Sequence, residues 1–324
     1  MNFKTLFQGF NDTKVLIVGD AMIDAYMWGE INRISPEAPV PVVEVKKHEN
    51  RLGGAANVAL NLKALGANPI LCSVIGTDER GVLFEKLMKE SNLSAEGILS
   101  SNKRKTTIKT RVIAENKHQL RFDEEDTFPI TETKEFLKLI ESLMKDIDVI
   151  ILQDYNKGVL IPEIIEGVID SANKNGIPTI VDPKKLNFNS YKNCTIFKPN
   201  LAEIKSGMNI DFDANNVDEI EKASSELRAQ LDAKGILLTL SEKGICINSE
   251  KEFKHTPAFK CDIIDVSGAG DTVISVASLC LASGIDYIDL SVLSTLAGGI
   301  VCEQVGVVPI NKEKLLTQAL KNIS

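Results

Sequence analysis

The second half of the chain alternates between helical and strand-like segments, and this alternation restricts the possible fold more than any other feature. Helical patterns at 131–146 and 162–175 each lead into a short apolar run, at 148–153 and at 178–181. Such runs, bounded by polar turns, predict strands that are buried on both faces. Strands separated by helices pair in parallel, with the helices covering the sheet. The sequence therefore predicts an α/β fold with a central, mainly parallel sheet.

Polar side chains follow four of the expected strands. The apolar run 14–19 ends at Asp20, with Asp24 just beyond it. The later runs are followed by Asp154, by Asp182, and by Asn200 and Glu203. Because ligands of open α/β sheets bind outside the carboxyl ends of the strands, these residues are candidates for one shared site. The first two acids could hold sugar hydroxyls, although an Asx turn explains Asp24 equally well.

A glycine-rich loop, Ser267-Gly268-Ala269-Gly270-Asp271, stands directly before a long apolar segment. A helix beginning there would direct free N–H groups and the positive end of its dipole at a bound anion, typically phosphate. Asp271 would stand beside that anion and could accept a proton, as phosphoryl transfer to a hydroxyl requires. The loop alone fits an ordinary helix cap as well as it fits a phosphate cradle.

A second pair of glycines, Gly53-Gly54, opens a helix of small and apolar residues that ends near Gly66. Asn57 falls in the first turn of this helix, where its side-chain amide could face a ligand. Close packing of the helix on the sheet would explain both glycines, but it does not require Asn57.

Two segments, 25–48 and 104–123, interrupt the strand–helix alternation with strand-like patterns and predict a β insertion that leaves the main sheet. In the second segment, Glu115-Asn116-Lys117 predicts a hairpin turn. Basic residues alternate with apolar ones along its strands, at Lys105, Lys109, Arg111 and Arg121. A basic strand face could bind a substrate phosphate, while charge that protects an exposed sheet edge is the alternative for each single residue.

Composition narrows the functional classes. The chain has 324 residues and a net charge of -8, which argues against a nucleic-acid-binding surface. No apolar run reaches transmembrane length, and the N-terminus has no signal-peptide pattern, so we expect neither a membrane partner nor secretion. Six scattered cysteines without a C-x-x-C pair indicate reduced thiols in a cytoplasmic protein. The three histidines lack the spacing of a metal site or a triad.

Common nucleotide-binding motifs do not occur. The sequence contains neither a Walker-type G-x-x-x-x-G-K-[ST] loop nor a G-x-G-x-x-G fingerprint at the start of a βα unit. If the chain uses ATP, the loop Ser267–Asp271 is left as the phosphate holder.

Taken together, the Gly53–Asn57 helix start and the Ser267–Asp271 loop resemble the PfkB/ribokinase family of sugar kinases, in the family's order and over nearly the whole chain. Further motifs resemble the kinase domain of bifunctional heptose kinase/adenylyltransferases. These motifs are Gly19-Asp-Ala-Met-Ile-Asp24, Arg33-Ile-Ser-Pro-Glu-Ala-Pro-Val-Pro-Val42, Gln153-Asp-Tyr-Asn-Lys-Gly158, Val181-Asp-Pro-Lys184 and Lys198-Pro-Asn-Leu-Ala-Glu203. The Arg33–Val42 run discriminates best, because ribokinases and fructokinases lack it.

This resemblance implies a ribokinase-like three-layer α/β/α sandwich formed as one domain over 1–324. The lid, a small β-sheet, would come from the insertions at 25–48 and 104–123. Related lids pair between subunits, so the resemblance also implies a homodimer.

The resemblance further implies roles for individual residues. Asp271 matches the catalytic base, and the amides of Gly268, Ala269 and Gly270 match the anion hole. Sugar contacts would come from Asp20, Asp24, Gly53, Gly54, Asn57 and Asp154. Asn200 and Glu203 match the N-x-x-E element that orders Mg²⁺ beside ATP. Thr239, Ser241 and Gly244 match the ATP-side loop, 297–305 would lie beside the adenine, and Asp265 matches a site for a monovalent cation such as K⁺.

The implied activity is ATP-dependent phosphorylation of D-glycero-D-manno-heptose 7-phosphate on its 1-hydroxyl, towards ADP-heptose for lipopolysaccharide or another surface glycan. The substrate phosphate would need cations, and the candidates are Arg33, Lys109, Arg111, Arg121, Lys157 and Lys185.

Three features depart from the pattern of the family: Ser267 replaces the usual Thr, Ala25 replaces a frequent Arg, and no H-x-G-H adenylyltransferase motif occurs. Adenylyl transfer would then fall to another protein. The alternatives are a PfkB-type kinase for another sugar, sugar phosphate or nucleoside, and a non-catalytic sugar sensor of the same fold.

Overall fold

The computed structural model describes residues 2–115 and 117–323. Its main sheet has nine strands in the order β13-β12-β11-β10-β9-β8-β1-β4-β5. The strands are β1 (Lys14–Gly19), β4 (Asn68–Gly76), β5 (Ile98–Ser101), β8 (Val149–Gln153), β9 (Thr179–Asp182), β10 (Ile196–Phe197), β11 (Gly235–Thr239), β12 (Ile245–Ser249) and β13 (Phe253–Thr256). Pairing is parallel from β5 to β11 and antiparallel only at β12 and β13. The predicted, mainly parallel sheet is confirmed.

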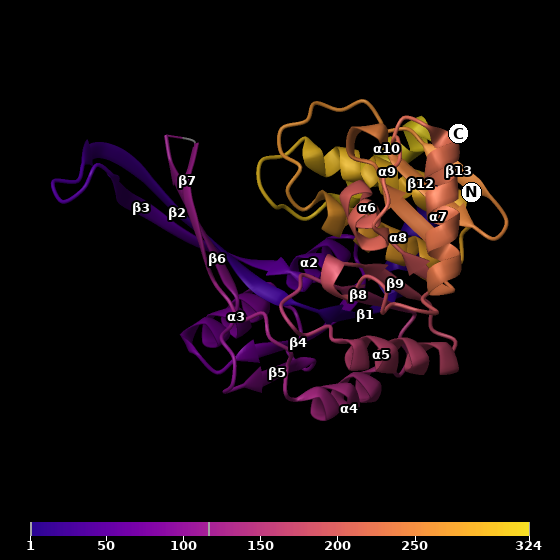
Figure 1. Ribbon diagram of the computed structural model, residues 1–324, viewed down its shortest axis with the longest axis horizontal. Helices are drawn as coiled ribbons and strands as arrows, with labels where there is room; N and C mark the ends of the chain where they lie inside the picture. Colours follow the sequence, from indigo (N-terminus) through magenta and orange to yellow (C-terminus); the bar gives the residue numbers. More distant parts are fainter. Residues whose placement is uncertain (1, 116, 324) are drawn as a thin grey trace.

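Helices cover both faces of this sheet (Figure 1). They are α1 (Phe3–Gly9), α2 (Ala55–Ala64), α3 (Glu79–Glu90), α4 (Thr133–Leu143), α5 (Pro162–Lys174), α6 (Leu201–Met208), α7 (Val217–Leu231), α8 (Ala269–Ala282), α9 (Tyr287–Cys302) and α10 (Lys312–Asn322). Along β1, Val15 and Ile17 join one hydrophobic core with α2, α8 and α9, while Leu16 and Val18 join a second core with α4, α5 and α7. This alternation explains why the run 14–19 is apolar throughout.

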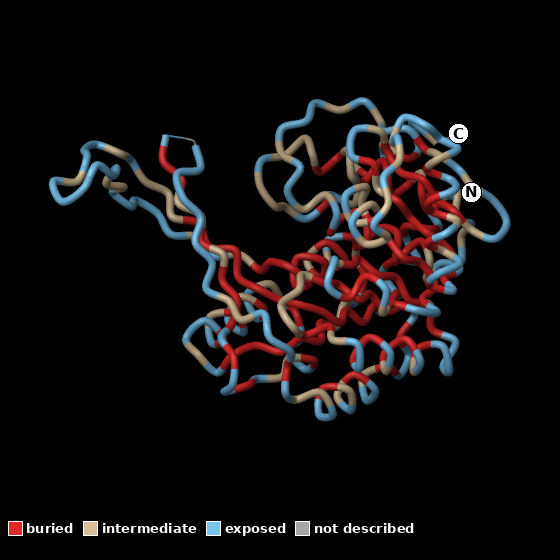
Figure 2. The backbone as a smooth tube through the Cα atoms, viewed as in Figure 1, coloured by how far each residue is buried: buried red, intermediate tan, exposed pale blue. Residues whose placement is uncertain are grey.

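A second, four-stranded sheet, here called the lid sheet, has the order β3-β2-β6-β7. It comprises β2 (Ala21–Ile34), β3 (Pro41–Gly54), β6 (Ile108–Ala114) and β7 (Lys117–Glu124). The sheet projects from the α/β body, and its outer part is largely exposed whereas buried residues fill the body (Figures 1 and 2). Both predicted insertions therefore contribute strands, although β2 and β3 are longer than 25–48 suggested. Asn116, in the predicted hairpin turn, lies outside the described residues.

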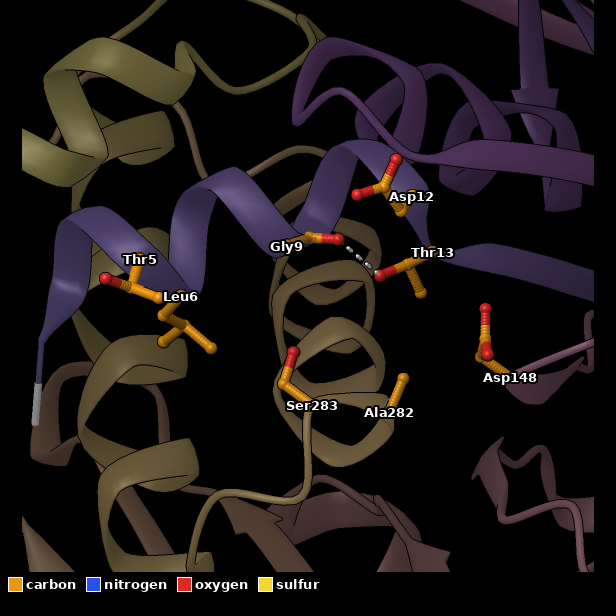
Figure 3. Close-up of a pocket in the computed structure, with 8 residues that line it drawn as sticks. All are labelled: Thr5, Leu6, Gly9, Asp12, Thr13, Asp148, Ala282 and Ser283. Atoms are coloured by element: carbon orange, nitrogen blue, oxygen red, sulfur yellow. Dashed lines mark hydrogen bonds between the residues drawn. The ribbon is translucent and has the colours of Figure 1, made fainter.

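The order β10-β9-β8-β1 places the polar strand ends side by side, as predicted from the sequence. A cavity of about 410 Å³ lies at the opposite ends of β1 and β8. It is lined by Thr5, Leu6, Gly9, Asp12, Thr13, Asp148, Ala282 and Ser283. Figure 3 shows these residues, with the Thr13 hydroxyl donating a 3.1 Å hydrogen bond to the Gly9 carbonyl. This cavity belongs to the end of the sheet remote from the strand ends that carry the polar residues.

An N-terminal helix and a short strand at one edge of the main sheet complete the fold. The N-terminal helix α1 packs Phe3 and Phe7 into the core, and the short edge strand β5 pairs with β4. Among residues 2–115 and 117–323, no helix has both the length and the apolar character that a membrane crossing requires.

Candidate active site

The N-terminus of α8 carries Asp271 at the carboxyl edge of the sheet. Gly268 precedes the helix with a φ of 81°, a left-handed conformation that glycine adopts without strain. Gly270 is exposed, whereas Asp271 is only 7% exposed. The helix thus turns its N-terminus outward while the carboxylate reaches into the body. A helix N-terminus of this kind favours a bound anion.

Three side chains donate hydrogen bonds to the Asp271 carboxylate. Asn57 Nδ2 lies 2.7 Å from Oδ2. The Tyr155 hydroxyl lies 2.7 Å from Oδ1, and Gln153 Nε2 lies 3.3 Å from the same oxygen. Asn57 comes from α2, and the other two residues come from the end of β8 and the loop after it. The carboxylate is therefore held from two sides by donors from separate elements.

Burial raises the pKa of Asp271 to about 6, although the hydrogen bonds from Asn57 and Tyr155 act in the opposite direction. A carboxylate with this pKa is mostly ionised at neutral pH yet is a stronger base than an exposed aspartate. Such a value suits a general base that works near pH 7.

Beside the glycine loop lies a buried ion pair. Lys198 Nζ is 3.1 Å from Asp182 Oδ2, and their side chains are 3% and 8% exposed. A Cβ placed on Gly270 would lie 3.9 Å from each of these two atoms. The loop therefore passes directly over this ion pair, which places the Lys198 ammonium group near the helix terminus with its charge partly offset by Asp182.

Lys184 forms a second cationic contact at this edge. Its ammonium group lies 2.5 Å from Glu203 Oε1 and 5.8 Å from the centre of the Tyr155 ring. Burial lowers the pKa of Lys184, but the carboxylates of Asp182 and Glu203 outweigh this effect and leave the pKa raised. The lysine therefore keeps its charge at physiological pH.

Asn200 and Glu203 form a capping box at the start of α6, in which each side chain accepts the other's backbone N–H. Asn200 also forms a parallel bridge with Thr239, so the structure brings these two predicted nucleotide-side residues together. Ser241 and Gly244 follow in left-handed conformations, at φ of 53° and 95°. The predicted ATP-side residues are thus contiguous.

The residues at this edge suit Mg²⁺ that is shared with a substrate phosphate. No group of three or more acidic, His or Cys residues able to hold a metal occurs in the part of the chain that the structure describes. Mg²⁺ at nucleotide sites is usually held by one or two carboxylates together with substrate phosphates. The oxygen donors of Asn200 and Glu203 fit that arrangement and do not fit a closed protein cage.

The loop before α8 rests on the segment after α9. Asp265 accepts hydrogen bonds from the backbone N–H groups of Ser267 and Gly306, which lower its pKa against the opposing effect of burial. Ile264 and Val305 are 60% and 72% exposed. Apolar residues therefore line the approach to the glycine loop near the predicted adenine segment 297–305.

One of the three predicted anion-hole amides is already paired, because Ala269 donates its N–H to the carbonyl of Val266.

On the sugar side, Asp24 lies on β2 near the base of the lid sheet. Its Oδ1 accepts a 2.5 Å hydrogen bond from Arg111, and its Oδ2 lies so close to Gly53 that a Cβ there would approach within 2.2 Å. Gly54 has a φ of 59° and is followed by α2, which carries Asn57. Glycine is needed at both positions for steric reasons: Gly53 leaves room for the Asp24 carboxylate, and Gly54 has a positive φ. Asp24 therefore lies close to the start of α2, the helix whose Asn57 contacts Asp271.

The structure corrects the expectation for Asp20 and Asp154. Asp20 accepts three backbone hydrogen bonds, from Tyr155, Lys157 and Val159, and it is 1% exposed. Asp154 is fully buried and accepts bonds from the Tyr191 hydroxyl and the Asn156 N–H. Both acids hold the loop after β8 in shape instead of facing a sugar.

The predicted phosphate-binding cations do not form one cluster. Lys109, Arg121 and Lys157 are ion-paired with Asp123 and Glu125. Arg33 and Lys185 are exposed, the first on the outer part of β2 and the second in a 3₁₀ turn after β9. Among the described residues, Arg111 is the one member of this pool whose side chain contacts a predicted sugar-binding residue.

Comparison with protein families decides the identity. The model of the pfkB family carbohydrate kinases matches residues 12–314. The chain belongs to the pfkB family of carbohydrate kinases. As a member of this family it is a phosphotransferase that acts on an alcohol group.

Curated pfkB relatives include proteins named bifunctional protein HldE. The one from Citrifermentans bemidjiense is 38% identical over 320 residues, which cover 97% of this chain and 65% of the relative. The one from Desulfatibacillum aliphaticivorans is 40% identical over 316 residues, covering 95% and 63%. The chain thus spans just under two thirds of the length of these relatives.

Solved structures support the pfkB fold. Ribokinase from Arabidopsis thaliana, complexed with ribose and ATP, matches with a TM-score of 0.74 and 18% identity, covering 94% of this chain and 98% of the other. Phosphofructokinase-2 from Escherichia coli, in complex with potassium, matches with a TM-score of 0.77 at the same identity and coverage. The ribokinase-like fold is confirmed.

Four residues of this kinase site were not singled out from the sequence: Gln153, Tyr155, Lys184 and Lys198. All four lie inside motifs that carried the family resemblance, and that position was the signal available for Gln153, Tyr155 and Lys184. Lys198 follows a strand directly and precedes Asn200, a place where a buried lysine is unusual unless it is paired.

Proposed function

We propose that this pfkB kinase transfers the γ-phosphoryl group of ATP to the anomeric 1-hydroxyl of D-glycero-D-manno-heptose 7-phosphate, giving the 1,7-bisphosphate for ADP-heptose synthesis. The observation that carries the kinase chemistry is Asp271, a buried carboxylate with a pKa of about 6 at the exposed N-terminus of α8. The choice of sugar rests on the Arg33–Val42 segment. It is supported by the HldE relatives, which align over 90% or more of the chain.

In the proposed mechanism, Asp271 accepts the proton of the attacking hydroxyl as its oxygen bonds to the γ-phosphorus of ATP. The bond from that phosphorus to the bridging oxygen breaks, and ADP leaves. Asn57 and Tyr155 keep the carboxylate oriented until the substrate arrives. The N-terminus of α8 and Lys198 stabilise the negative charge of the transferring phosphoryl group. Asp24, Gly53 and Gly54 would border the sugar, and the lid sheet would exclude water.

The nucleotide would lie along the predicted ATP side. Asn200 and Glu203 would hold Mg²⁺ through oxygen ligands, and the ion would neutralise charge on the nucleotide phosphates. Thr239, Ser241 and Gly244 would border the phosphates, and 297–305 the adenine. The Asp265 carbonyl would contribute to a monovalent-cation site.

A kinase for another sugar, sugar phosphate or nucleoside is the alternative within the family. A non-catalytic sugar sensor is the alternative outside it, and the intact constellation of Asp271, Asn200 and Glu203 speaks against that alternative. ADP release measured with a panel of acceptors distinguishes all three. We expect the highest kcat/KM with heptose 7-phosphate. A higher value with ribose, fructose or fructose 6-phosphate would favour the kinase for another acceptor. No ADP release with any acceptor would favour the non-catalytic sensor.

We also propose that the chain acts as one kinase unit that dimerises through the lid sheet. The register places Met27, Val112, Leu120 and Phe122 on one face of this sheet, and Leu120 is 60% exposed. A second lid sheet of the same chain would cover this apolar face. Light scattering should give the mass of a dimer, and Leu120→Asp should give a monomer; a monomeric wild type would contradict the proposal.

We propose a cytoplasmic location, because all six cysteines are free and thiols persist in a reducing compartment. Fractionation of the source cells would test this, and recovery of the protein outside the cytoplasm would contradict it.

A further inference from the structure

The face of the lid sheet opposite to Leu120 carries a cluster of arginines. On β2, Tyr26 pairs with Arg111 of β6, and Arg111 pairs in turn with Arg121 of β7. Asp24 of β2 pairs with Arg51 of β3. Residues paired directly across strands share a face, and so do residues two apart along one strand. Arg51, Arg111 and Arg121 therefore project from the same face, around Tyr26.

Two of these arginines contact one aromatic ring. The guanidinium carbons of Arg51 and Arg111 lie 5.1 and 5.4 Å from the centre of the Tyr26 ring. Arg111 and Arg121 are direct cross-strand neighbours, an arrangement in which like charges destabilise a sheet. Each guanidinium group has one carboxylate partner, which is Glu49 for Arg51, Asp24 for Arg111 and Asp123 for Arg121. The N–H donors that these pairs leave over have the planar, forked geometry that suits a phosphate group particularly well.

The present partners of Arg51 and Arg111 leave donors available. Arg111 uses Nη1 for Asp24, and its side chain is 20% exposed. Arg51 bonds Glu49 and, through Nη1, the carbonyl of Val307 at 3.2 Å, and its side chain is 33% exposed. Each guanidinium has five N–H donors, so both retain donors for a ligand. By contrast, Lys109 and Lys157 share Glu125, and their side chains are only 12% and 14% exposed.

The arginine cluster borders the catalytic loop. Val307, which Arg51 contacts, lies beside Gly268, because a Cβ on that glycine would meet the valine Cγ1 at 3.1 Å. Arg111 contacts Asp24, which adjoins Gly53 at the start of the segment leading to Asn57. A ligand whose hydroxyl reaches Asp271 would thus present its far end to the lid face that carries the arginines.

We propose that Arg51 and Arg111 bind the phosphate monoester of the substrate over the ring of Tyr26, with Arg121 as the outer cation of this subsite. The inference rests on the proposed function, since it supplies the contact that a phosphorylated sugar requires. It assigns a role to Arg51, which the sequence did not indicate, and it removes Arg33, Lys109, Lys157 and Lys185 from the candidates. The neighbouring indole supports a polar ligand here: Trp28 stacks on Tyr26, and its Nε1 has no hydrogen-bond partner among the described residues.

Discrimination between phosphorylated and unphosphorylated acceptors tests the subsite. The assay compares kcat/KM within two pairs, heptose 7-phosphate with heptose and fructose 6-phosphate with fructose. It is run for wild type, Arg51→Met, Arg111→Met and Arg111→Lys. Lys46→Met is the control, because it removes a lid cation whose ion-pair partner among the described residues is Glu44. Calorimetric binding of each acceptor without ATP gives a second readout.

We expect Arg51→Met and Arg111→Met each to lower the phosphorylated-to-unphosphorylated ratio by about 10- to 100-fold, as loss of a charge-assisted hydrogen bond does. Arg111→Lys should retain part of the preference, and Lys46→Met all of it. A wild type that prefers fructose 6-phosphate would overturn the proposed substrate, while the subsite would stand if the arginine variants lower that preference. The inference is overturned if wild type neither binds nor uses the phosphorylated member of either pair better, or if the variants lose both members equally.

Discussion

The hydroxyl of Tyr155 donates a 2.7 Å hydrogen bond to Oδ1 of Asp271, from a loop whose backbone is held by Asp20. Tyr155 is partly buried, and burial together with the nearby carboxylates raises its pKa well above the usual value. It therefore remains a donor throughout the physiological range. The bond ties the proton acceptor to the loop after β8, so the shape of that loop sets the orientation of the carboxylate.

Loss of this bond should change the pH dependence of the kinase. A hydrogen bond to the ionised form lowers the pKa of a carboxylate, so Tyr155→Phe should raise the pKa of Asp271 above its value of about 6. The acidic limb of kcat/KM should then move to higher pH, and activity at pH 6 should fall about 3- to 10-fold. A pH–rate profile from pH 5 to 9 measures this shift.

Tyr191→Phe is the matched control for that profile, because Tyr191 is a buried tyrosine that likewise donates a 2.7 Å bond to a carboxylate, that of Asp154. We expect it to lower the melting temperature and to leave the acidic limb in place. Equal shifts in both variants would show that Tyr155 acts only through general stability.

Removal of the base should separate turnover from binding. Asp271→Asn should lower kcat by about 10²- to 10⁴-fold, the usual contribution of a general base. ATP binding, measured by calorimetry, should persist because the helix terminus and Lys198 are unchanged. Turnover close to that of wild type would remove Asp271 from the mechanism.

The carboxylate of Glu203 should affect the requirement for Mg²⁺. Glu203→Gln keeps an acceptor for the Asn200 N–H but loses the charge that would attract the cation, so half-maximal activity should need several-fold more Mg²⁺. Glu219→Gln is the control, because Glu219 follows the N-cap residue Asn216 of α7 by the same three positions. Mg²⁺ titrations that are identical for the two variants would contradict the role of Glu203.

The steric contact between Gly53 and Asp24 should make the glycine irreplaceable. A Cβ in Gly53→Ala would lie 2.2 Å from Asp24 Oδ2, so the carboxylate must move, and KM for the sugar should rise at least tenfold. Gly9→Ala is the control, since nothing lies within 4 Å of its Cβ position and the residue is helical. Unchanged sugar kinetics in Gly53→Ala would mean that Asp24 does not contact the substrate.

The sequence predicted well how the strands around the site are arranged, because an alternation of strands and helices is compatible with few topologies. The ends of β1, β8, β9 and β10 lie side by side as expected. The pattern could not reveal which way each polar side chain turns. Asp20 and Asp154 were expected to face a sugar, but both hold the loop 154–159 because backbone N–H groups and Tyr191 satisfy their oxygens.

The sequence also could not predict contacts between residues that are far apart along the chain. Tyr155 is 116 residues from Asp271, and nothing in the local pattern around either residue shows that they meet. Arg51 was not among the predicted site residues, and only the strand register reveals that it shares a face with Arg111. Chemistry at a sheet edge can thus be located from sequence, whereas the individual partners depend on the three-dimensional arrangement.

Identification of the product tests the central claim most directly. The protein is incubated with ATP, Mg²⁺ and D-glycero-D-manno-heptose 7-phosphate, and the products are followed by ³¹P NMR, with Asp271→Asn as the control. We predict one new resonance that is coupled to the anomeric proton, equal in amount to the ADP formed and absent with the variant. Phosphorylation at another hydroxyl, or ADP formation without a new sugar phosphate, would contradict the account.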